Sequence, residues 1–447
     1  MMNSLFSKLQ VFLFGIFMLC LIGVIDSIPV IVTLVYFYTG IIVFLYAKKG
    51  VADPRVFPLA FMSVYFTFFP LRAYLYGSEN LPFDEGVLIL SLRLQFIAML
   101  VFVAVSNLLI SNVRQVEIST FCSQQVRSTS SERLLFVFML PFVFYSLVII
   151  LTSDATSKRE VLDSFSSVKT ISDFSILILT VLVFLRAARI GRFFYKDLFL
   201  MLYLVFCVFY VLLTGERDSL FKLLFGFMII YYDRRGNFNF LKMIAIFGAL
   251  LFVVPVSQYF KSVLLSGTVN FDRFGGDLIL YSEFMSSSRN FYSLLVFDAG
   301  QNISFLLSDV VRAFVPTALL GDYGMQSTVA WFDRVFRPEH GFDGTSGWGF
   351  TIVGFGYIVG GLAGIVLIMA FYAWLLAFLY NRRWRSLYWY AFYILALAAF
   401  VYALRADLAN LLSQVFKISG LCVLFVFMAH YLLRRPSGSG DLNKGQL

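Results

Sequence analysis

The chain has 447 residues, of which 60% are hydrophobic, 19% aromatic and 14% charged, with a formal net charge of +9 and a mean hydropathy of +0.84. Soluble domains carry roughly 25% charged residues, so this composition excludes a soluble enzyme, a disordered chain and a receptor with a single membrane anchor. It predicts an all-α polytopic membrane protein.

The N-terminal segment has some features of a signal peptide, because Lys8 precedes the apolar residues 9–25. No A-x-A cleavage site follows, and residues 25–27 lead directly into another apolar run. We therefore expect an uncleaved first membrane span.

Apolar runs between charged breaks predict twelve spanning helices, since a span needs about 20 mostly apolar residues. They lie at residues 9–26, 29–47, 57–76, 87–110, 134–152, 172–186, 197–214, 219–232, 243–260, 350–380, 387–404 and 409–432. The sixth and eighth are short, at 15 and 14 residues, so their ends are the least well defined.

The distribution of positive charge predicts the orientation. With both termini in the cytoplasm, 20 of the 35 Lys and Arg residues lie on the cytoplasmic side, and each cytoplasmic segment has at least one. The positive-inside rule therefore favours twelve spans with both ends inside. The positive excess then reflects topology, and no nucleic-acid partner is expected.

Metal and nucleotide chemistry find no support in the sequence. The four cysteines have no metal-ligand spacing, and three of them lie in apolar runs, where a thiol usually acts as a small hydrophobic group. No Ser-His-Asp, HExxH, Walker A or GxGxxG pattern stands out, which argues against proteases and ATP-driven pumps. We expect neither a cofactor nor a metal.

A long outward-facing loop interrupts the pattern of short connections. The predicted organisation is residues 1–260 with nine spans, the loop at 261–349, residues 350–432 with three spans, and a cytoplasmic tail at 433–447. The loop has 89 residues, with six basic and nine acidic side chains and a net charge of −3. Loops this long usually have a function, although a small solvated cap is the alternative. Its apolar patches at 291–297 and 305–307 are expected to form short helices on the bilayer surface.

Several cations are predicted at the outer membrane surface. Arg217 lies in the tight turn 214–219, and Arg405 lies in the turn 404–408 before the last span. Arg93 is about seven residues into the fourth span, or on the order of 10 Å at 1.5 Å per residue. Ionisable residues at such depths usually face a cavity or a partner, and Arg binds phosphate through two parallel hydrogen bonds. These cations therefore suit a phosphate or pyrophosphate group.

Lys222, just inside the eighth span, and Lys417, about nine residues into the last span, are further candidates, but several of these cations also have a plainer explanation. Asp218 and Lys222 are four residues apart and can pair on one helix face. Lys417 can extend its ammonium group to the interface, and Arg405 can pair with a neighbouring acid.

His340 is a candidate general base near the end of the loop, in the run RPEHGFDGTSGWGF at 337–350. Glu339 and Asp343 flank it, and imidazole exchanges protons near neutral pH. An ordinary exposed loop histidine is the alternative.

In these features the sequence resembles the Wzy-type polysaccharide polymerases, which extend O-antigen and enterobacterial common antigen. The resemblance covers nearly the whole chain in architecture, with about twelve spans and a large periplasmic loop late in the sequence. Four segments resemble the family locally: TGERDSL at 214–220 with Arg217, SSSRNFYSLL at 286–295 with Arg289, the Gly-rich run 337–364 with His340, and ALRADLANLLSQVF at 403–416 with Arg405.

The resemblance implies a GT-C-like, metal-independent glycosyltransferase of lipopolysaccharide biosynthesis in the bacterial inner membrane. It would transfer a growing glycan from undecaprenyl pyrophosphate to a lipid-linked repeat unit at the periplasmic face. Arg217, Arg289 and Arg405, with Arg93, would bind the pyrophosphate, and His340 or a loop carboxylate would be the base. The implied partners are the lipid-linked oligosaccharide donor and acceptor, the bilayer, a chain-length regulator and a flippase.

Other functions share parts of this pattern. An O-antigen ligase has the same topology, Arg turns and loop histidine, but transfers the glycan to lipid A-core. A lipid-linked oligosaccharide flippase or another transporter usually has paired charges near the midplane and two similar halves. The surface-level cations and single large loop of this chain favour an enzyme. A purely structural subunit of an assembly complex would leave the Arg turns without a role.

Overall fold

The computed structural model of the chain describes residues 2–78, 80–110, 129–152, 158–190, 196–214, 217–235, 283–315, 327–341 and 349–433, together with residues 242, 244 and 248. Its regular elements in these ranges are helices. The long ones are α1 (Met2–Val24), α2 (Ile28–Ala47), α3 (Phe57–Tyr76), α4 (Glu85–Leu109), α6 (Thr129–Thr152), α7 (Lys158–Ile190), α8 (Leu198–Thr214), α9 (Arg217–Arg235), α17 (Ile352–Arg382) and α18 (Leu387–Ala403). The shorter ones are α12 (Glu283–Val296), α13 (Ser304–Phe314), α15 (Thr328–Trp331), η3 (Phe332–Phe336), α16 (Arg337–Glu339), η4 (Arg383–Arg385), α19 (Leu408–Leu412), η5 (Ser413–Gly420) and α20 (Leu421–Leu432).

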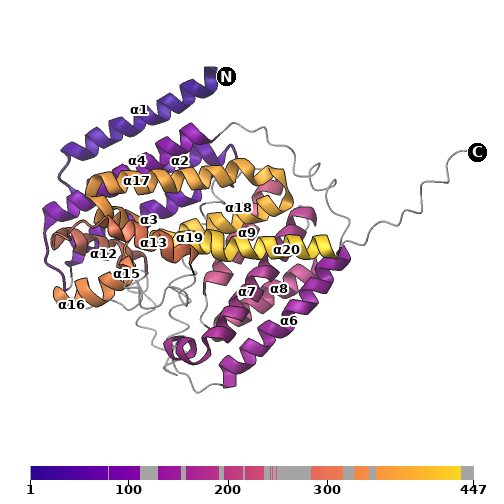
Figure 1. Cartoon of the computed structure of the whole chain (residues 1–447). Coiled ribbons are helices and arrows are strands. Elements are labelled where there is room, and N and C mark those ends of the chain that lie inside the picture. Colours follow the sequence, from indigo (N-terminus) through magenta and orange to yellow (C-terminus); the bar gives the residue numbers. More distant parts are fainter. Residues whose placement is uncertain are drawn as a thin grey trace, which may run out of the picture.

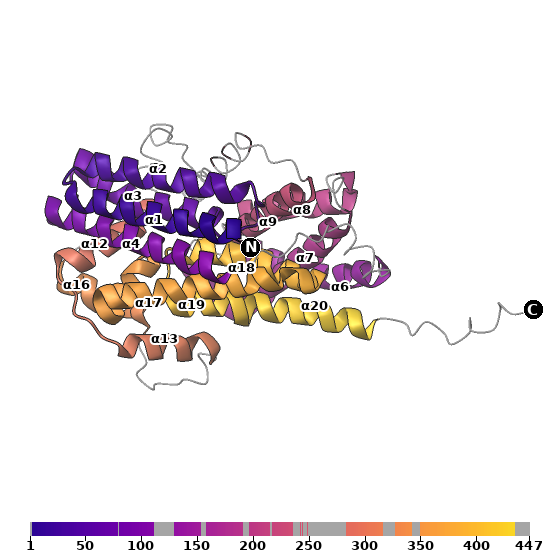
Figure 2. The ribbon, with the colours of Figure 1, turned by 90° about the horizontal axis from the view of Figure 1, so that it is seen from above.

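The long helices form an elongated bundle (Figures 1 and 2). Helix α4 packs along α17, α2 packs on α3, and α6 packs on α7. Helix α18 lies at the centre, where it contacts α3, α7, α9, α17 and α20. A helix that is apolar all round is a buried helix, and α18 is buried from Tyr393 to Val401 without a break.

Five helices are long and apolar enough to cross a membrane. They are Ile28–Ala47, Glu85–Leu109, Ile171–Ile190, Ile352–Arg385 and Leu408–Leu432. Shorter apolar helices lie at Lys8–Val24, Leu198–Val208 and Leu387–Ala403. Large apolar side chains such as Phe17, Val137 and Leu202 are exposed on the outside of the bundle, as expected for helices that face lipid. The chain is therefore a helical membrane protein, while the number of twelve spans stays a prediction.

Most of the predicted segments coincide with helices in the described residues. The closest agreement is at residues 57–76, which form α3 with the same bounds. The sixth predicted segment, 172–186, is instead part of the 33-residue helix α7, whose polar first half gave no hydropathy signal. The ninth segment, 243–260, lies outside the described residues apart from two single positions, and so does the tail after residue 433.

Helix α17 is broken near its start, where the sequence predicted one continuous span over residues 350–380. Gly360 and Gly361 have non-helical backbone angles, and Gly361 has a φ of +57°, a conformation that favours glycine. The break frees backbone carbonyls, and the Ile358 carbonyl accepts a hydrogen bond from the Asn302 N–H at 2.7 Å. The first two turns of α17 are thus tied to the segment before α13.

The two parts of α17 touch through glycine. A Cβ atom on Gly364 would lie 2.1 Å from the Gly356 carbonyl oxygen, whereas a Cβ on Gly360 would meet nothing within 4 Å. Gly364→Ala is therefore expected to lower the free energy of unfolding by about 1–3 kcal/mol through overpacking, and Gly360→Ala is the matched control. Thermal melting of the purified proteins in detergent compares them. Equal melting temperatures for the two variants would contradict the packing at this break.

Helix α12 does not lie on the bilayer surface, as the sequence predicted for residues 291–297. Its residues from Met285 to Leu295 are all buried, because the helix packs against α3, α4 and α17. Tyr292 donates a hydrogen bond to the Pro82 carbonyl at 2.7 Å and accepts one from the Asp84 N–H at 2.9 Å. Helix α13 agrees better with the predicted helix on the bilayer surface, because its side chains Leu307 and Phe314 are exposed.

Candidate functional site

Segments that carry three of the predicted site residues lie at one end of the bundle. Helix α12 carries Arg289, His340 follows α16, and the turn between α18 and α19 carries Arg405. Helices α12, α13 and α16 lie on the side away from the end of α20 in Figures 1 and 2, and α13 packs on α19. We call this part of the structure the loop end of the bundle. It consists of α12, α13, the consecutive elements α15, η3 and α16, and the α18–α19 turn.

The turn that carries Arg405 is held from several directions. The Leu404 carbonyl accepts a hydrogen bond from the Ile352 N–H at 3.1 Å. Gly349 packs on the turn so closely that a Cβ atom would lie 2.9 Å from the Arg405 carbonyl oxygen. The Arg405 guanidinium lies over the Tyr402 ring at 4.1 Å, a cation–π contact. Arg405 therefore occupies a defined position.

Arg289 is a buried cation on α12, with 6% of its surface exposed. The next residue, Asn290, donates a hydrogen bond from Nδ2 to the Gly349 carbonyl at 3.3 Å. Gly349 therefore contacts both the helix of Arg289 and the turn of Arg405. Three buried serines, Ser286 to Ser288, precede Arg289 on the same helix and make this stretch polar as well as buried.

Two buried carboxylates lie beside the Arg405 turn. Asp309 of α13 is fully buried, and its two oxygens accept hydrogen bonds from the N–H and the hydroxyl of Thr328, at 3.3 and 3.0 Å. Asp407 accepts a hydrogen bond from the Asn410 N–H at 2.8 Å and caps α19. Burial, and then the charge of Asp407, raise the pKa of Asp309 to about 7, while the charge of Arg312 acts against this shift. Burial also raises the pKa of Asp407.

Lys222 has a partner that the sequence did not predict. The buried ammonium group of this α9 residue donates to Gln414 Oε1 at 2.9 Å, whereas the expected partner was Asp218, whose side chain lies outside the described residues. Gln414 and the half-buried Lys417 both belong to the π-helical stretch η5. Such stretches are rare and frequently mark functional sites. The contact joins the beginning of α9 to the helix that follows Arg405.

Two other predicted residues fall at or beyond the limits of the described structure. Arg217 is the first residue of α9, and its side chain lies outside the described residues. Asp343, one of the alternatives for the general base, lies in the segment 342–348, which is also outside them. Both assignments stay predictions.

His340 lies against aromatic rings at the end of α16. Its imidazole stacks on Phe297 with a centroid distance of 4.4 Å and an interplanar angle of 5°, and it meets the edge of Phe336 at 4.6 Å. These contacts set the plane of the ring. Glu339 beside it is exposed.

Arg93 makes a structural contact with the end of α1 and the residues that follow it. It donates to the carbonyls of Ile22 and Ile25, both at 3.2 Å, and pairs with Asp26 at 2.9 Å. Ile22 lies in the last turn of α1, where carbonyls lack helical partners. Arg93 therefore caps the end of α1, a contact that accounts for the depth of its charge without a substrate.

Asp309, Thr328 and Arg312 were not singled out by the sequence analysis. Asp309 lies between Ser308 and Val310 in a mostly apolar helix, and the single acid in this helix was the available signal. Thr328 had no comparable signal, because its role depends on the contact between α15 and α13.

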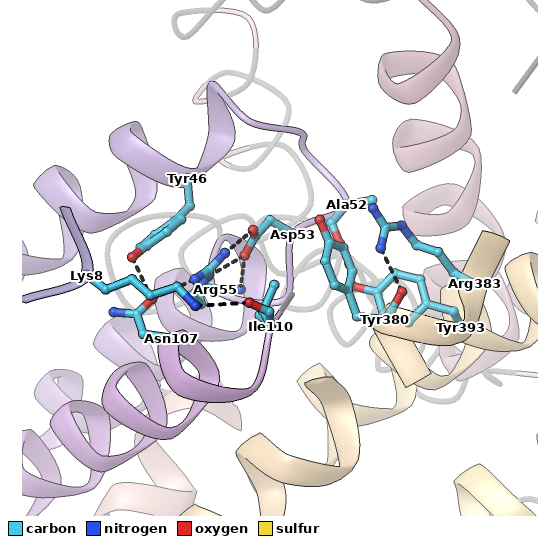
Figure 3. Close-up of polar contacts among 10 residues, drawn as sticks. All are labelled: Lys8, Tyr46, Ala52, Asp53, Arg55, Asn107, Ile110, Tyr380, Arg383 and Tyr393. Carbon is cyan, nitrogen blue, oxygen red and sulfur yellow. Dashed lines mark hydrogen bonds and ion pairs between the residues drawn. The ribbon is translucent and has the colours of Figure 1, made fainter. Parts of the chain in front are cut away.

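A second polar cluster lies at the opposite end of the bundle, where α2, α4 and α17 end (Figure 3). Arg55 is 4% exposed and binds Asp53 through two hydrogen bonds, with Nε to Oδ1 at 2.7 Å. Arg55 Nη1 and the Tyr46 hydroxyl both donate to Asn107 Oδ1, at 2.6 and 2.5 Å. The guanidinium lies over the Tyr46 ring at 3.5 Å. The α2–α3 turn is thereby fixed to α4.

The same turn is also fixed to α18, and a second arginine is buried at the end of α17. Tyr393 of α18 donates to the Ala52 carbonyl, and Arg383 donates to the Tyr380 carbonyl at 2.6 Å while its guanidinium lies over the Tyr380 ring (Figure 3). The sequence analysis treated Arg55 and Arg383 as topological charges facing the cytoplasm. The structure buries both side chains. Arg55 joins the α2–α3 turn to α4, and Arg383 contacts Tyr380 at the end of α17.

Neither cluster suggests a metal centre. In the part of the chain that the structure describes, no three His, Cys, Asp or Glu side chains gather in a way that could hold a metal ion. The groups that can bind an anion at the loop end are Arg and Lys side chains, which suits phosphate recognition.

Comparison of the chain with models of protein families, with curated proteins and with solved structures finds no match. The interpretation of the loop end therefore depends on its own residues.

Proposed function

We propose that this chain is a membrane glycosyltransferase that polymerises lipid-linked oligosaccharide repeat units, as the Wzy-type polymerases do. The donor is a growing glycan on undecaprenyl pyrophosphate, and the acceptor is one lipid-linked repeat unit. The proposed location is the bacterial inner membrane, with both termini in the cytoplasm and the loop end facing the periplasm.

The observation that supports the proposal most strongly is the packing around Gly349. This residue contacts the helix of Arg289 through Asn290 and the turn of Arg405 directly. Two arginines that are 116 positions apart in sequence thus belong to neighbouring segments at the loop end. Cations on neighbouring segments at the end of a membrane bundle are costly and usually face a partner or a ligand.

The proposed reaction is a displacement at the anomeric carbon of the donor sugar. The bond from this carbon to the pyrophosphate oxygen breaks, and a bond to a hydroxyl oxygen of the acceptor forms. The hydroxyl proton passes to a base, and undecaprenyl pyrophosphate leaves. Arg217, Arg289 and Arg405 are proposed to stabilise the negative charge on the leaving group, because fixed charges in a site shielded from water stabilise such charge strongly.

His340 is the proposed base, with Glu339 and Asp343 as alternatives. A neutral imidazole accepts a proton at neutral pH, and its stacking on Phe297 keeps the ring in one plane. A base with a fixed orientation is needed to meet one hydroxyl of the acceptor.

Reconstitution tests this function directly. The purified chain in liposomes is given undecaprenyl-pyrophosphate-linked repeat units, and the products are separated by size. The proposal predicts glycans of several repeats together with free undecaprenyl pyrophosphate. Transfer only onto added lipid A-core would identify a ligase, and movement of the substrate across the bilayer without new bonds would identify a flippase.

The role of His340 is tested by two substitutions. His340→Ala is expected to lower the polymerisation rate about 10²- to 10⁴-fold, the usual contribution of a general base. His340→Phe is the matched variant, because it keeps an aromatic ring on Phe297 but has no proton acceptor, and it is expected to be as slow as His340→Ala. Initial rates in liposomes provide the comparison. Full activity of His340→Phe would transfer the role of base to Glu339 or Asp343.

A further inference from the structure

Asp309 and Asp407 come together where α13 packs on α19, and one segment contacts both. Thr328 donates from its N–H and its hydroxyl to the two oxygens of Asp309. The backbone N–H of the next residue, Val329, acts on Asp407 and lowers the pKa of this carboxyl. Residues 328 and 329 begin α15, so this short helix joins the two carboxylates.

The cluster has an unbalanced charge. Asp309 is fully buried, Asp407 is 5% exposed, and the positive charge of Arg312 acts on both. Two carboxylates and one guanidinium leave one negative charge in excess. Because the charge of Asp407 acts on Asp309, the two buried carboxylates do not both ionise without further compensation. A single proton on the pair removes the excess charge.

We propose that Asp309 and Asp407, sharing one proton beside the positive charge of Arg312 and joined to α15 through Thr328, form a positioning cluster that fixes the Arg405 turn to the loop helices. Asp407 is the second residue after Arg405 and caps the helix that follows it. A displacement of Asp407 therefore displaces Arg405. The inference rests on the proposed function only in that Arg405 contacts the substrate pyrophosphate.

The surroundings of Asp309 favour a proton shared between Asp309 and Asp407. Burial and the charge of Asp407 raise the pKa of Asp309 to about 7. Because this pKa is raised in the folded protein, the stabilisation that it provides is complete at acidic pH and is lost as the pH rises through about 7. Besides Asp407 and Arg312, the charged groups on the elements packed around Asp309 are Arg405 on the turn, Lys417 on η5, and the residues Asp333, Arg334 and Arg337 that follow α15. Of these, Asp333 is paired with Arg337 at 2.9 Å.

The first test measures stability and does not depend on any activity. The full chain is purified in detergent, and its melting temperature is recorded from pH 5 to pH 9. The wild type is expected to lose stability up to about pH 7 and then to level off. Asp309→Asn, which keeps an oxygen acceptor for the Thr328 N–H and stays neutral, is expected to lose this pH dependence and to melt at or above the wild-type temperature at pH 8.

Asp298→Asn is the matched control. Asp298 is an exposed acid at the loop end with a φ of +46°, a conformation that Asn tolerates, and this variant is expected to keep the wild-type pH profile. Thr328→Val supplies a second variant, because the Thr328 hydroxyl bond lowers the pKa of Asp309 and its loss should move the transition to higher pH. A wild-type pH profile in both Asp309→Asn and Thr328→Val would overturn the cluster.

The second test connects the cluster to the site. In liposomes, the KM of the wild type for the lipid-pyrophosphate donor is expected to rise severalfold between pH 6.5 and pH 8.5, an estimate that follows from loss of the proton near pH 7. Asp309→Asn should show no such rise, with kcat affected less than KM. A KM profile parallel to that of the wild type would overturn the positioning role. A wild type that makes no polymer would refute the proposed function, and the melting profiles would still decide on the cluster.

Discussion

Replacing Arg405 with alanine is expected to abolish polymer formation while the protein stays folded in the membrane. In the proposed reaction, this guanidinium stabilises the charge that develops on the leaving pyrophosphate. Loss of one such group usually lowers the rate by about 10²- to 10³-fold. The Arg405 turn itself is held by the Leu404 carbonyl, by Gly349 and by the Asp407 cap, so the fold does not depend on this side chain alone.

Arg405→Lys is the matched variant. It keeps the charge but loses the two parallel hydrogen bonds that a guanidinium makes to phosphate, and it is expected to have an intermediate rate. Initial rates in liposomes compare the two variants with the wild type, and melting temperatures in detergent control for folding. Wild-type activity in a folded Arg405→Ala protein would remove Arg405 from the proposed site.

Replacing Arg55 with methionine is expected to cause a large loss of stability. The substitution leaves the Asp53 carboxylate buried without its guanidinium and removes a donor to Asn107. Removal of one partner from a buried ion pair costs about 3–5 kcal/mol. The loss also loosens the α2–α3 turn from α4, because Arg55 joins the two. Thermal and denaturant unfolding of the purified protein provide the measurement.

Two controls isolate this effect. Lys48→Met removes an exposed cation from the same turn and is expected to change stability little. The double variant Arg55→Met with Asp53→Leu is expected to recover much of the loss, because it leaves no unpaired buried carboxylate. An Arg55→Met protein as stable as Lys48→Met would show that the buried pair contributes little to the fold.

The positions of several helices were predictable from local sequence alone. Helix α3 begins at Phe57 beside a proline suited to a first helical turn and ends before Gly77, which has a φ of +84°. Helix α4 follows Asp84, whose side chain accepts a hydrogen bond from the Val87 N–H. In these places the apolar run and its flanking residues indicate the same bounds.

Features that depend on contacts between distant segments were not predictable. Gly360 and Gly361 lie in an apolar run that is compatible with one continuous helix, and the break becomes understandable only when Asn302 is seen to bind the Ile358 carbonyl. Arg93 had the depth expected of a substrate ligand, but its partners on α1 are about 70 positions away in the sequence. Hydropathy and charge indicate how deep a residue lies in the membrane, but they do not indicate which helix packs against it.

In the candidate site too, local features were predictable from the sequence and contacts between distant segments were not. Arg289 and Arg405 were identified from local sequence, and their neighbouring positions became visible through Gly349. Asp309 and Thr328 were missed because their contact joins two short helices of a loop. The single acid in a mostly apolar helix was the one sequence signal for Asp309, and it is weakened by Arg312, which follows three positions later and can pair with an acid on the same helix face.

The central claim is that the chain joins lipid-linked repeat units into a polymer, and the surface-polysaccharide ladder of a strain that lacks the gene tests it most directly. The account predicts that the ladder stops at lipid A-core plus a single repeat unit, and that the wild-type gene restores it while the Arg405→Ala gene does not. An unchanged ladder, or the loss of even the single repeat, would contradict the account.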